Sequence, residues 1–264
     1  MFDSAQARVN PSPKAAPAMT KSHLSDGDNP SREKDPSSYG DDIAPDLDQN
    51  YNPDNDPTVR AIGVMGSSGG PMDSEVRRRS FELGEAIAHA GCTLVTGASP
   101  GLPYDAARGA QAAGGLSVGI SPALSRNEHV MRYRSPVDAF DVIVYTGSGL
   151  MGREVHNIHS SDIVIIVGGR SGTLGEFCVA FDEGKLIGVL EDSGGIAEAL
   201  PEIVPQLGKR TDAVIIYDSD PEKLVRRCIE RYRSSHYRRP STFVEDLGEE
   251  HAWPASRSSA PRAS

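Results

Sequence analysis

The chain has 264 residues with a formal net charge of -10 at pH 7. This acidic balance argues against a nucleic-acid partner, because duplex binding relies mainly on Lys and Arg side chains that neutralise phosphates. The sequence shows neither a secretory h-region nor an apolar run close to the roughly 20 residues that a membrane helix needs, so we expect a soluble, cytoplasmic protein without a membrane partner.

Composition divides the chain into three parts. Residues 1–57 are rich in Pro, Asp, Ser and Asn and lack clustered large apolar side chains, and residues 234–264 lose hydrophobic periodicity. Such segments bury too little apolar surface to offset the entropy of ordering. We therefore predict a disordered acidic, Pro-rich N-terminal tail, a Rossmann-like nucleotide-binding domain at 58–233, and a mostly disordered C-terminal tail.

The predicted domain alternates short β-rich runs with stretches of helical periodicity. Strands that are apolar on both faces, such as IVIIV at 163–167, belong to sheets covered by helices on each side. The alternation predicts an α/β fold, a Rossmann-like doubly wound and mostly parallel sheet of about seven strands with helices on both faces. The expected strands lie at 59–65, 93–95, 116–120, 142–145, 163–167, 186–190 and 214–217.

The first helix is expected over residues 73–90. Asp73 is placed to cap its N-terminus and Gly91 to end it. The basic run at 77–79 is interpreted as a solvated helix face rather than a nucleic-acid patch. Asp105, which follows the second strand, is expected to cap the next helix, although a contact with ribose is a second possibility.

Glycine-bearing loops follow four of the predicted strands. They are GSSGG at 66–70, TGASPGLP at 96–103, TGSGLMGRE at 146–154 and GGRSGTLGE at 168–176. In doubly wound sheets, ligands bind beyond the carboxyl ends of the strands, and glycine loops with helix N-termini present backbone N–H groups to an anion. Together the loops predict a nucleotide or sugar-phosphate site. The GxGxxG and Walker patterns are missing, and we expect neither hydride transfer, triphosphate hydrolysis nor a cofactor.

The residues predicted to contact phosphate or nucleotide come from the loops after the first, second and fifth strands. No metal site is predicted, because His156 and His159 stand three apart without an evident third ligand. The predicted contacts are Gly66, Ser67, Ser68, Gly97, Gly101, Gly168, Gly169, Arg170, Ser171, Gly172 and Thr173.

Several segments resemble the Lonely Guy (LOG) family over about residues 61–190, namely GVMGSSGG, LGEAIAHAG, LVTG and GGRSGTLGE. Arg153 stands nine residues before Asp162, as the essential Arg of the family does, and the family motif PGGxGTxxE is matched at Gly169, Gly172, Thr173 and Glu176. The resemblance implies a Rossmann-like homodimer that hydrolyses the N-glycosidic bond of a nucleoside 5′-monophosphate. The products would be free base and ribose 5-phosphate, with Glu176 and Arg153 as catalytic residues.

Some positions depart from the LOG pattern. Gly168 replaces the Pro of the motif, Arg170 replaces a Gly, and Glu154 replaces the Lys that usually follows the essential Arg. The loop after the second strand keeps Gly97 and Gly101 but loses most of the family sequence GGGxxGLMG. We therefore interpret the chain as a divergent branch. Arg170 could clamp a phosphate, fill the space of a substrate, or lie exposed.

The chemistry follows from the residue types. Cleavage of an N-glycosidic bond develops positive charge on the ribose, which the Glu176 carboxylate can stabilise, or it can activate water. Arg153 can hold the phosphate or the departing base through a fork of hydrogen bonds. Three functions stay open: a phosphoribohydrolase acting on a nucleoside monophosphate or related phosphorylated small molecule, a non-catalytic carrier or sensor of a nucleotide or pterin cofactor, and an interaction protein whose acidic tail recruits a partner.

Overall fold

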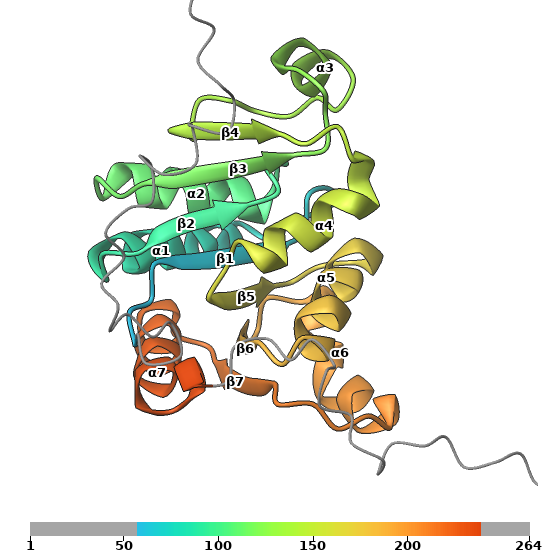
Figure 1. Cartoon of the computed structure of the whole chain (residues 1–264). Helices are drawn as coiled ribbons and strands as arrows, with labels where there is room; N and C mark the ends of the chain where they lie inside the picture. The colour runs from blue at the N-terminus through green and yellow to red at the C-terminus, as the bar shows by residue number, and fades with distance from the viewer. Residues whose placement is uncertain (1–56, 239–264) are drawn as a thin grey trace, which may run out of the picture. The chain divides into compact units, whose positions relative to one another are not determined.

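The computed structural model describes residues 57–238, and these form a parallel sheet with helices between its strands (Figure 1). The predicted tails lie outside the described residues, apart from Pro57 and residues 234–238. The strands are β1 (Ala61–Gly66), β2 (Thr93–Thr96), β3 (Ser117–Ser121), β4 (Val142–Tyr145), β5 (Ile163–Val167), β6 (Leu186–Leu190) and β7 (Val214–Asp218).

Helices follow the strands in alternation. The described helices are too short or too polar to cross a membrane. They are α1 (Ser74–His89), α2 (Leu102–Ala112), α3 (Arg126–Met131), α4 (Gly149–His159), α5 (Ser171–Asp182), α6 (Gly195–Ile203) and α7 (Pro221–Ser234), with short 3-10 turns η3 (Val204–Leu207) and η4 (His236–Arg238).

The sheet has seven strands in the order β4-β3-β2-β1-β5-β6-β7, and every neighbouring pair is parallel. The chain winds outward from β1 to β4, then returns to the other side of β1 to begin β5. The prediction of a Rossmann-like doubly wound sheet is therefore confirmed. The strand order reverses between β1 and β5, which is where ligands bind in folds of this kind.

Buried clusters lie on both faces of the sheet. On one face, Ile62 and Val64 of β1 pack with side chains of α1, α2 and α7. On the other face, Met65 of β1 packs with side chains of α4, α5 and α6. All five residues of β5 are fully buried, and they alternate between the two clusters. This burial accounts for the unbroken apolar run IVIIV.

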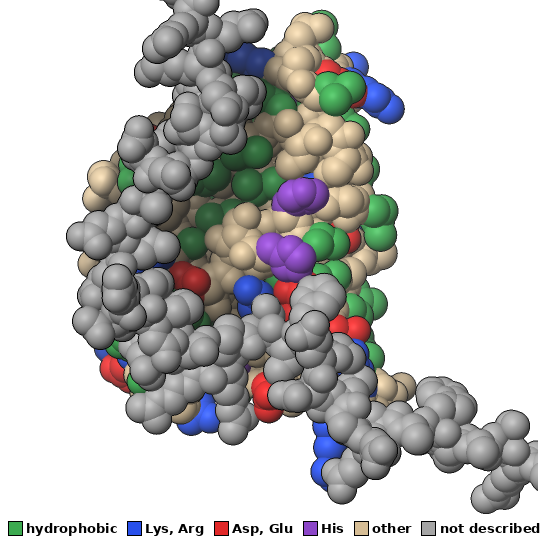
Figure 2. All heavy atoms as spheres, viewed as in Figure 1, with side chains coloured by type: hydrophobic (Ala, Val, Ile, Leu, Met, Phe, Trp, Pro, Cys, Tyr) green, Lys and Arg blue, Asp and Glu red, His purple; other side chains and the backbone are tan. Residues whose placement is uncertain are grey.

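The edge strand β4 is less well covered. On the face seen in Figures 1 and 2, hydrophobic side chains are visible in a hollow over β2 to β4, where no described helix lies in front of the sheet. Val142 and Val144 of β4 are 54% and 44% exposed, and Met151 and Val155 of the nearby α4 are also exposed. Exposed apolar side chains that gather on one face mark interaction surfaces more often than isolated ones do.

Asp73 and Asp105 were both expected to cap helices, and only Asp73 does so. Asp73 caps α1 as predicted, because its Oδ1 accepts a hydrogen bond from the backbone N–H of Glu75 at 2.7 Å. The cap predicted at Asp105 is wrong, since this residue is buried in the first turn of α2 and binds Arg77 through two hydrogen bonds of 2.7 and 2.9 Å. These bonds join residues that are far apart in sequence, so local capping rules do not detect them.

The basic run at 77–79 is not a uniformly solvated face. Arg79 is only 9% exposed, and its guanidinium donates to the backbone carbonyls of Glu191, Asp192 and Ser219. The interpretation of the run as a solvated face is therefore wrong at this position. Arg79 therefore connects α1 to the loops that follow β6 and β7.

Two glycines allow α1 and α2 to pack closely. A Cβ atom added at Gly84 of α1 would overlap the backbone carbonyl of Ala106, and one added at Gly109 of α2 would overlap the carbonyl of Phe81. The helices therefore meet backbone to backbone at a reciprocal pair of glycines. Helix α2 follows the loop after β2, so this contact fixes one wall of the sheet edge that carries the loops.

We expect Gly84→Ala to lower the free energy of unfolding by about 1–3 kcal/mol, because the added methyl group overpacks the contact. Alanine otherwise favours a helix over glycine by about 1 kcal/mol. The reverse change at the exposed Ala112 of α2, Ala112→Gly, should therefore also destabilise. Urea denaturation of the two variants measures both effects, and a Gly84→Ala protein as stable as the wild type would contradict the close contact.

Candidate functional site

A cavity of about 440 Å³ lies at the strand-order reversal, within the range of about 300–1,000 Å³ found for small-molecule sites. Its walls come from the end of β1, the loops after β1, β2 and β5, and helices α2, α4 and α5. Most of the residues predicted from the sequence line it together. They are Gly66, Ser67, Ser68, Gly97, Arg153, Arg170, Ser171, Gly172, Thr173 and Glu176.

Three predicted residues, Gly101, Gly168 and Gly169, lie behind the cavity wall. Gly101 has a φ of 87°, and a Cβ atom there would overlap the backbone carbonyl of Ser67. The same carbonyl accepts a hydrogen bond from the backbone N–H of Leu102 at 2.9 Å. Gly101 thus allows the loop after β2 to pack against the loop after β1, and it shapes the cavity without lining it.

Gly168 and Gly169 form the turn after β5, with φ values of 58° and 105°. Their backbone N–H groups donate to the hydroxyls of Ser193 and Ser67, both at 2.8 Å, and their carbonyls accept from N–H groups of α6 at 3.0 Å. Proline fixes φ at about −65°. The positive φ at Gly168 therefore explains why this chain has glycine where the LOG motif has proline.

Glu176 projects from the first half of α5 and is only 7% exposed. Its Oε1 accepts a hydrogen bond from Nδ2 of Asn157 at 3.2 Å, and Nη1 of Arg153 lies 3.8 Å from the same oxygen. Burial raises the pKa of Glu176 to about 7, although Arg153 and the bond from Asn157 act in the opposite direction and Glu154 adds to the rise. A carboxyl with such a pKa exchanges protons readily near neutral pH.

Arg153 lies on α4 and is 9% exposed. A Cβ atom added at Gly97 would overlap its guanidinium, so the glycine after β2 leaves the space that the arginine occupies. The Nε of Arg153 is buried and has no hydrogen-bond partner within residues 57–238. The arginine therefore lies beside Glu176 with a buried N–H donor that has no partner among the described residues.

Asn157 is a site residue that the sequence analysis did not identify. It is fully buried, four residues after Arg153 on α4, and its Nδ2 binds Glu176. Residues four apart lie on the same helix face, so the spacing from Arg153 could have indicated it. Its Oδ1 is buried without a partner in the described part of the chain.

Arg170 lies at the rim of the cavity. It precedes α5 and is exposed, and its Nη2 and Nη1 lie 3.4 and 3.8 Å from the positions that Cβ atoms would take at Gly69 and Gly70. The guanidinium thus extends over the loop after β1 instead of filling the space beside Glu176. From this position Arg170 could contact an anion bound at the rim of the cavity. This is the phosphate-clamp role among the three that the sequence left open.

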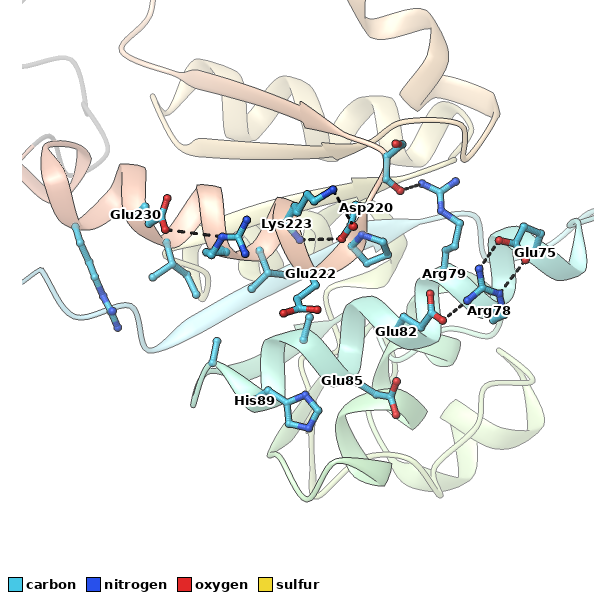
Figure 3. A pocket seen from close by; sticks show the side chains of 18 residues that line it. Glu75, Arg78, Arg79, Glu82, Glu85, His89, Asp220, Glu222, Lys223 and Glu230 are labelled. Atoms are coloured by element: carbon cyan, nitrogen blue, oxygen red, sulfur yellow. Dashed lines mark hydrogen bonds and ion pairs between the residues drawn. The ribbon is translucent and has the colours of Figure 1, made fainter.

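A larger groove of about 1040 Å³ runs between α1 and α7 (Figure 3). None of the predicted glycine loops lines it, and many of its charged side chains are already paired with one another. The cavity beside Glu176 is therefore the candidate site. The pairs in the groove are Arg78 with Glu75 and Glu82, Lys223 with Asp220, and Arg226 with Glu230.

The two histidines of α4 have other partners. Nδ1 of His156 lies 2.9 Å from the carbonyl of Gly152, and Nε2 of His159 lies 2.5 Å from Oε1 of Glu183. Within residues 57–238, no three or more His, Cys, Asp or Glu side chains are grouped so that they could hold a metal ion.

Comparison with known proteins identifies the family. The model of the SLOG cluster4 family matches residues 59–225, which is more than half of the chain. The chain belongs to the SLOG cluster4 family. An uncharacterized protein of Archaeoglobus fulgidus is 37% identical over 130 residues, which cover 49% of this SLOG chain and 79% of that protein. Membership in this family agrees with the interpretation as a divergent LOG-like branch.

Solved structures share the fold. The molybdenum cofactor carrier protein of Chlamydomonas reinhardtii is 26% identical, with a TM-score of 0.54 over 66% of this SLOG chain and 99% of that chain. The molybdenum cofactor binding protein of Rippkaea orientalis is 32% identical, with a TM-score of 0.53 over 67% and 97% of the two chains.

The raised pKa of Glu176 predicts a change of stability with pH. Between about pH 4 and pH 7 the folded protein retains a proton at Glu176 that the unfolded chain has released, so its free energy of unfolding falls as the pH rises through this window. The Glu176→Gln variant has no carboxyl that titrates at this position, so this fall in the free energy of unfolding is absent. We expect the variant to gain about 3 kcal/mol relative to the wild type between pH 4 and pH 8.

Urea denaturation across this pH range measures the difference. Glu202→Gln, at an exposed position of α6, is the control for removal of a Glu carboxylate outside the cavity. A difference between Glu176→Gln and the wild type that does not vary with pH would show that Glu176 titrates normally.

Proposed function

We propose that this SLOG protein is a LOG-like nucleoside 5′-monophosphate phosphoribohydrolase. The observation that carries the proposal is Glu176, a buried carboxyl with a pKa of about 7 that contacts Arg153 and Asn157 inside a cavity of small-molecule size. Burial of a carboxyl group without a close ion-pair partner destabilises the folded state. Such a group therefore favours a role in catalysis.

The proposed reaction needs few groups. The C1′–N bond of the nucleotide breaks, a water oxygen bonds to C1′, and the departing base ends with a proton. Ionised Glu176 would take a proton from the water or stabilise positive charge on the ribose, and Arg153 would bind the phosphate or the base. Backbone N–H groups at the start of α5, with Arg170 and the hydroxyls of Ser67 and Ser68, would hold the phosphate.

A non-catalytic carrier or sensor of a nucleotide or pterin cofactor is the second candidate. It is favoured by Glu154, Arg170 and Gly168, which depart from the LOG motif. It is also favoured by likeness to a molybdenum cofactor carrier protein and a molybdenum cofactor binding protein. Both functions use the same cavity and differ in whether the ligand is cleaved.

A cytoplasmic homodimer completes the proposal. The cysteines of the described residues are free thiols, as is usual in a reducing compartment. The exposed apolar residues Val142 and Val144 of β4 and Met151 and Val155 of α4 offer a surface for a second copy. Leu150 and Met151 also line the cavity, so this surface reaches the proposed site.

We expect Met151→Asp combined with Val144→Asp to shift the protein toward the monomer, because each change places a charge on a surface that would be buried in the dimer. Light scattering after size-exclusion chromatography measures the mass. Arg226→Asp on α7 lies on another helix and is the control. A wild-type protein that is monomeric at micromolar concentration would contradict the dimer.

Incubation with AMP, GMP, IMP, CMP and UMP, followed by chromatography of free base, tests the hydrolase. We expect release from at least one nucleotide, and a loss of about 10²–10⁴-fold in kcat for Glu176→Gln, because the carboxylate is removed while the cavity is kept. The control Glu202→Gln should keep full activity. A wild-type protein that binds a nucleotide or a pterin but releases no base would favour the carrier instead.

A further inference from the structure

Glu154 is a buried carboxylate that the proposed reaction does not use. It follows Arg153 on α4, lines the cavity and is 7% exposed. Its side chain makes no hydrogen bond or ion pair with another residue among those described. Burial raises the pKa of Glu154, and the nearby Arg153 opposes the rise. The carboxylate faces the cavity without a protein partner, so N–H donors of a ligand could bind its oxygens there.

Glycines on α5 surround the Glu154 carboxylate. Its Oε1 lies 3.4 Å from the position that a Cβ atom would take at Gly172, and its Oε2 lies 3.0 Å from the corresponding position at Gly175. Side chains at these two positions would close the space beside the carboxylate. These glycines therefore leave room for the Glu154 carboxylate beside α5.

Charge is unevenly distributed around the cavity. Arg170 extends over Gly69 and Gly70 at the loop after β1, whereas Glu154 and Glu176 lie at the wall between α4 and α5. A ligand that fits both ends carries an anionic group at one end and hydrogen-bond donors at the other. A phosphorylated nucleoside or pterin has this polarity when its ring system carries the donors.

The donor set can be specified from the chemistry of a carboxylate. Its two oxygens accept hydrogen bonds and donate none, and they suit two adjacent N–H groups. A cyclic guanidine edge, in which a ring N–H lies beside an exocyclic amino group, offers this pair. Adenine places a ring nitrogen acceptor beside its amino group, and hypoxanthine lacks the exocyclic amino group, so each offers the carboxylate only one donor at the corresponding edge.

We propose that Glu154 selects ligands with a cyclic guanidine edge, which guanine nucleotides and pterins share. The inference deepens the proposed function, since it names the ring system that the same cavity receives, and it rests on that cavity being the ligand site. The edge binds the Glu154 carboxylate through its ring N–H and its amino group. The anionic end of the ligand lies toward Arg170.

Isothermal titration calorimetry on Glu176→Gln protein tests the selection without turnover of the ligand. GMP and IMP differ only in the exocyclic amino group, so we expect GMP to bind at least about tenfold more tightly than IMP. Neopterin, which carries the same edge without a nucleotide, is the second probe, and its affinity relative to GMP separates a pterin from a nucleotide source. Equal binding of GMP and IMP, or no binding of GMP and neopterin, would overturn the proposal.

Two further substitutions, made in the same protein, test the role of the carboxylate. Glu154→Gln should bring the GMP-to-IMP affinity ratio below about threefold, because the amide replaces one acceptor with a donor. Gly175→Ala narrows the space beside Oε2 without changing charge, and it should lower GMP affinity several-fold even if Glu154→Gln folds poorly. The exposed control Glu202→Gln should keep the ratio. A ratio that persists in Glu154→Gln would assign the selection to other groups.

The outcomes for selection and for hydrolysis are separable. Wild-type protein that releases base equally from AMP, GMP and IMP would support the hydrolase and contradict selection by Glu154. Selective binding of GMP or neopterin without release of base would support the role of Glu154 and contradict the hydrolase.

Discussion

The parallel pairing of β1 with β5 is the constraint on which the site depends. Gly66 and Val167 are partners at the ends of these strands, and a side chain at Gly66 would overlap the carbonyl of Val167. The strands therefore end level with each other, and their loops emerge side by side. The bond from the N–H of Gly169 to the hydroxyl of Ser67 links the two loops directly. A shift in this register would separate the loops and open the cavity wall.

Helix α4 crosses this edge and supplies three polar residues to the site. Arg153 and Asn157, four residues apart, both approach Glu176, whereas Glu154 approaches the glycines of α5. In both cases a glycine stands where the polar group needs room: Gly97 in the loop after β2 makes space for the guanidinium, and the glycines of α5 make space for the carboxylate. The glycine loops thus do more than present backbone N–H groups to an anion, since they also accommodate buried charged side chains at close range.

The sequence predicted the bounds of several strands correctly, and most clearly where the residues are apolar on both faces of the sheet. The predicted bounds of β4, β5 and β6 agree with the structure, and β5 was readable because it is apolar on both faces. The start of β1 was predicted two residues early, since pairing with β2 begins at Ala61. The errors at Arg79 and Asp105 have one physical cause: their partners lie far away in sequence, and periodicity and capping rules describe only near neighbours. Motif spacing predicted most of the site residues. It did not predict the contact of Asn157 with Glu176, because that contact depends on how α4 packs against α5.

The LOG family usually has Lys where this chain has Glu154. This difference affects the protonation of Glu176, whose carboxyl group is present in both cases. A Lys beside Arg153 would add a second positive charge near Glu176 and hold its pKa down, so that the carboxyl would stay ionised. Burial is the main cause of the rise of the Glu176 pKa to about 7, and Glu154 adds to it. At neutral pH, Glu176 is then present in both forms, and the protonated form can donate to a departing base while the ionised form can activate water. A cationic group beside Glu154 would oppose this effect, whereas a neutral hydrogen-bond donor would leave the charge of Glu154 in place.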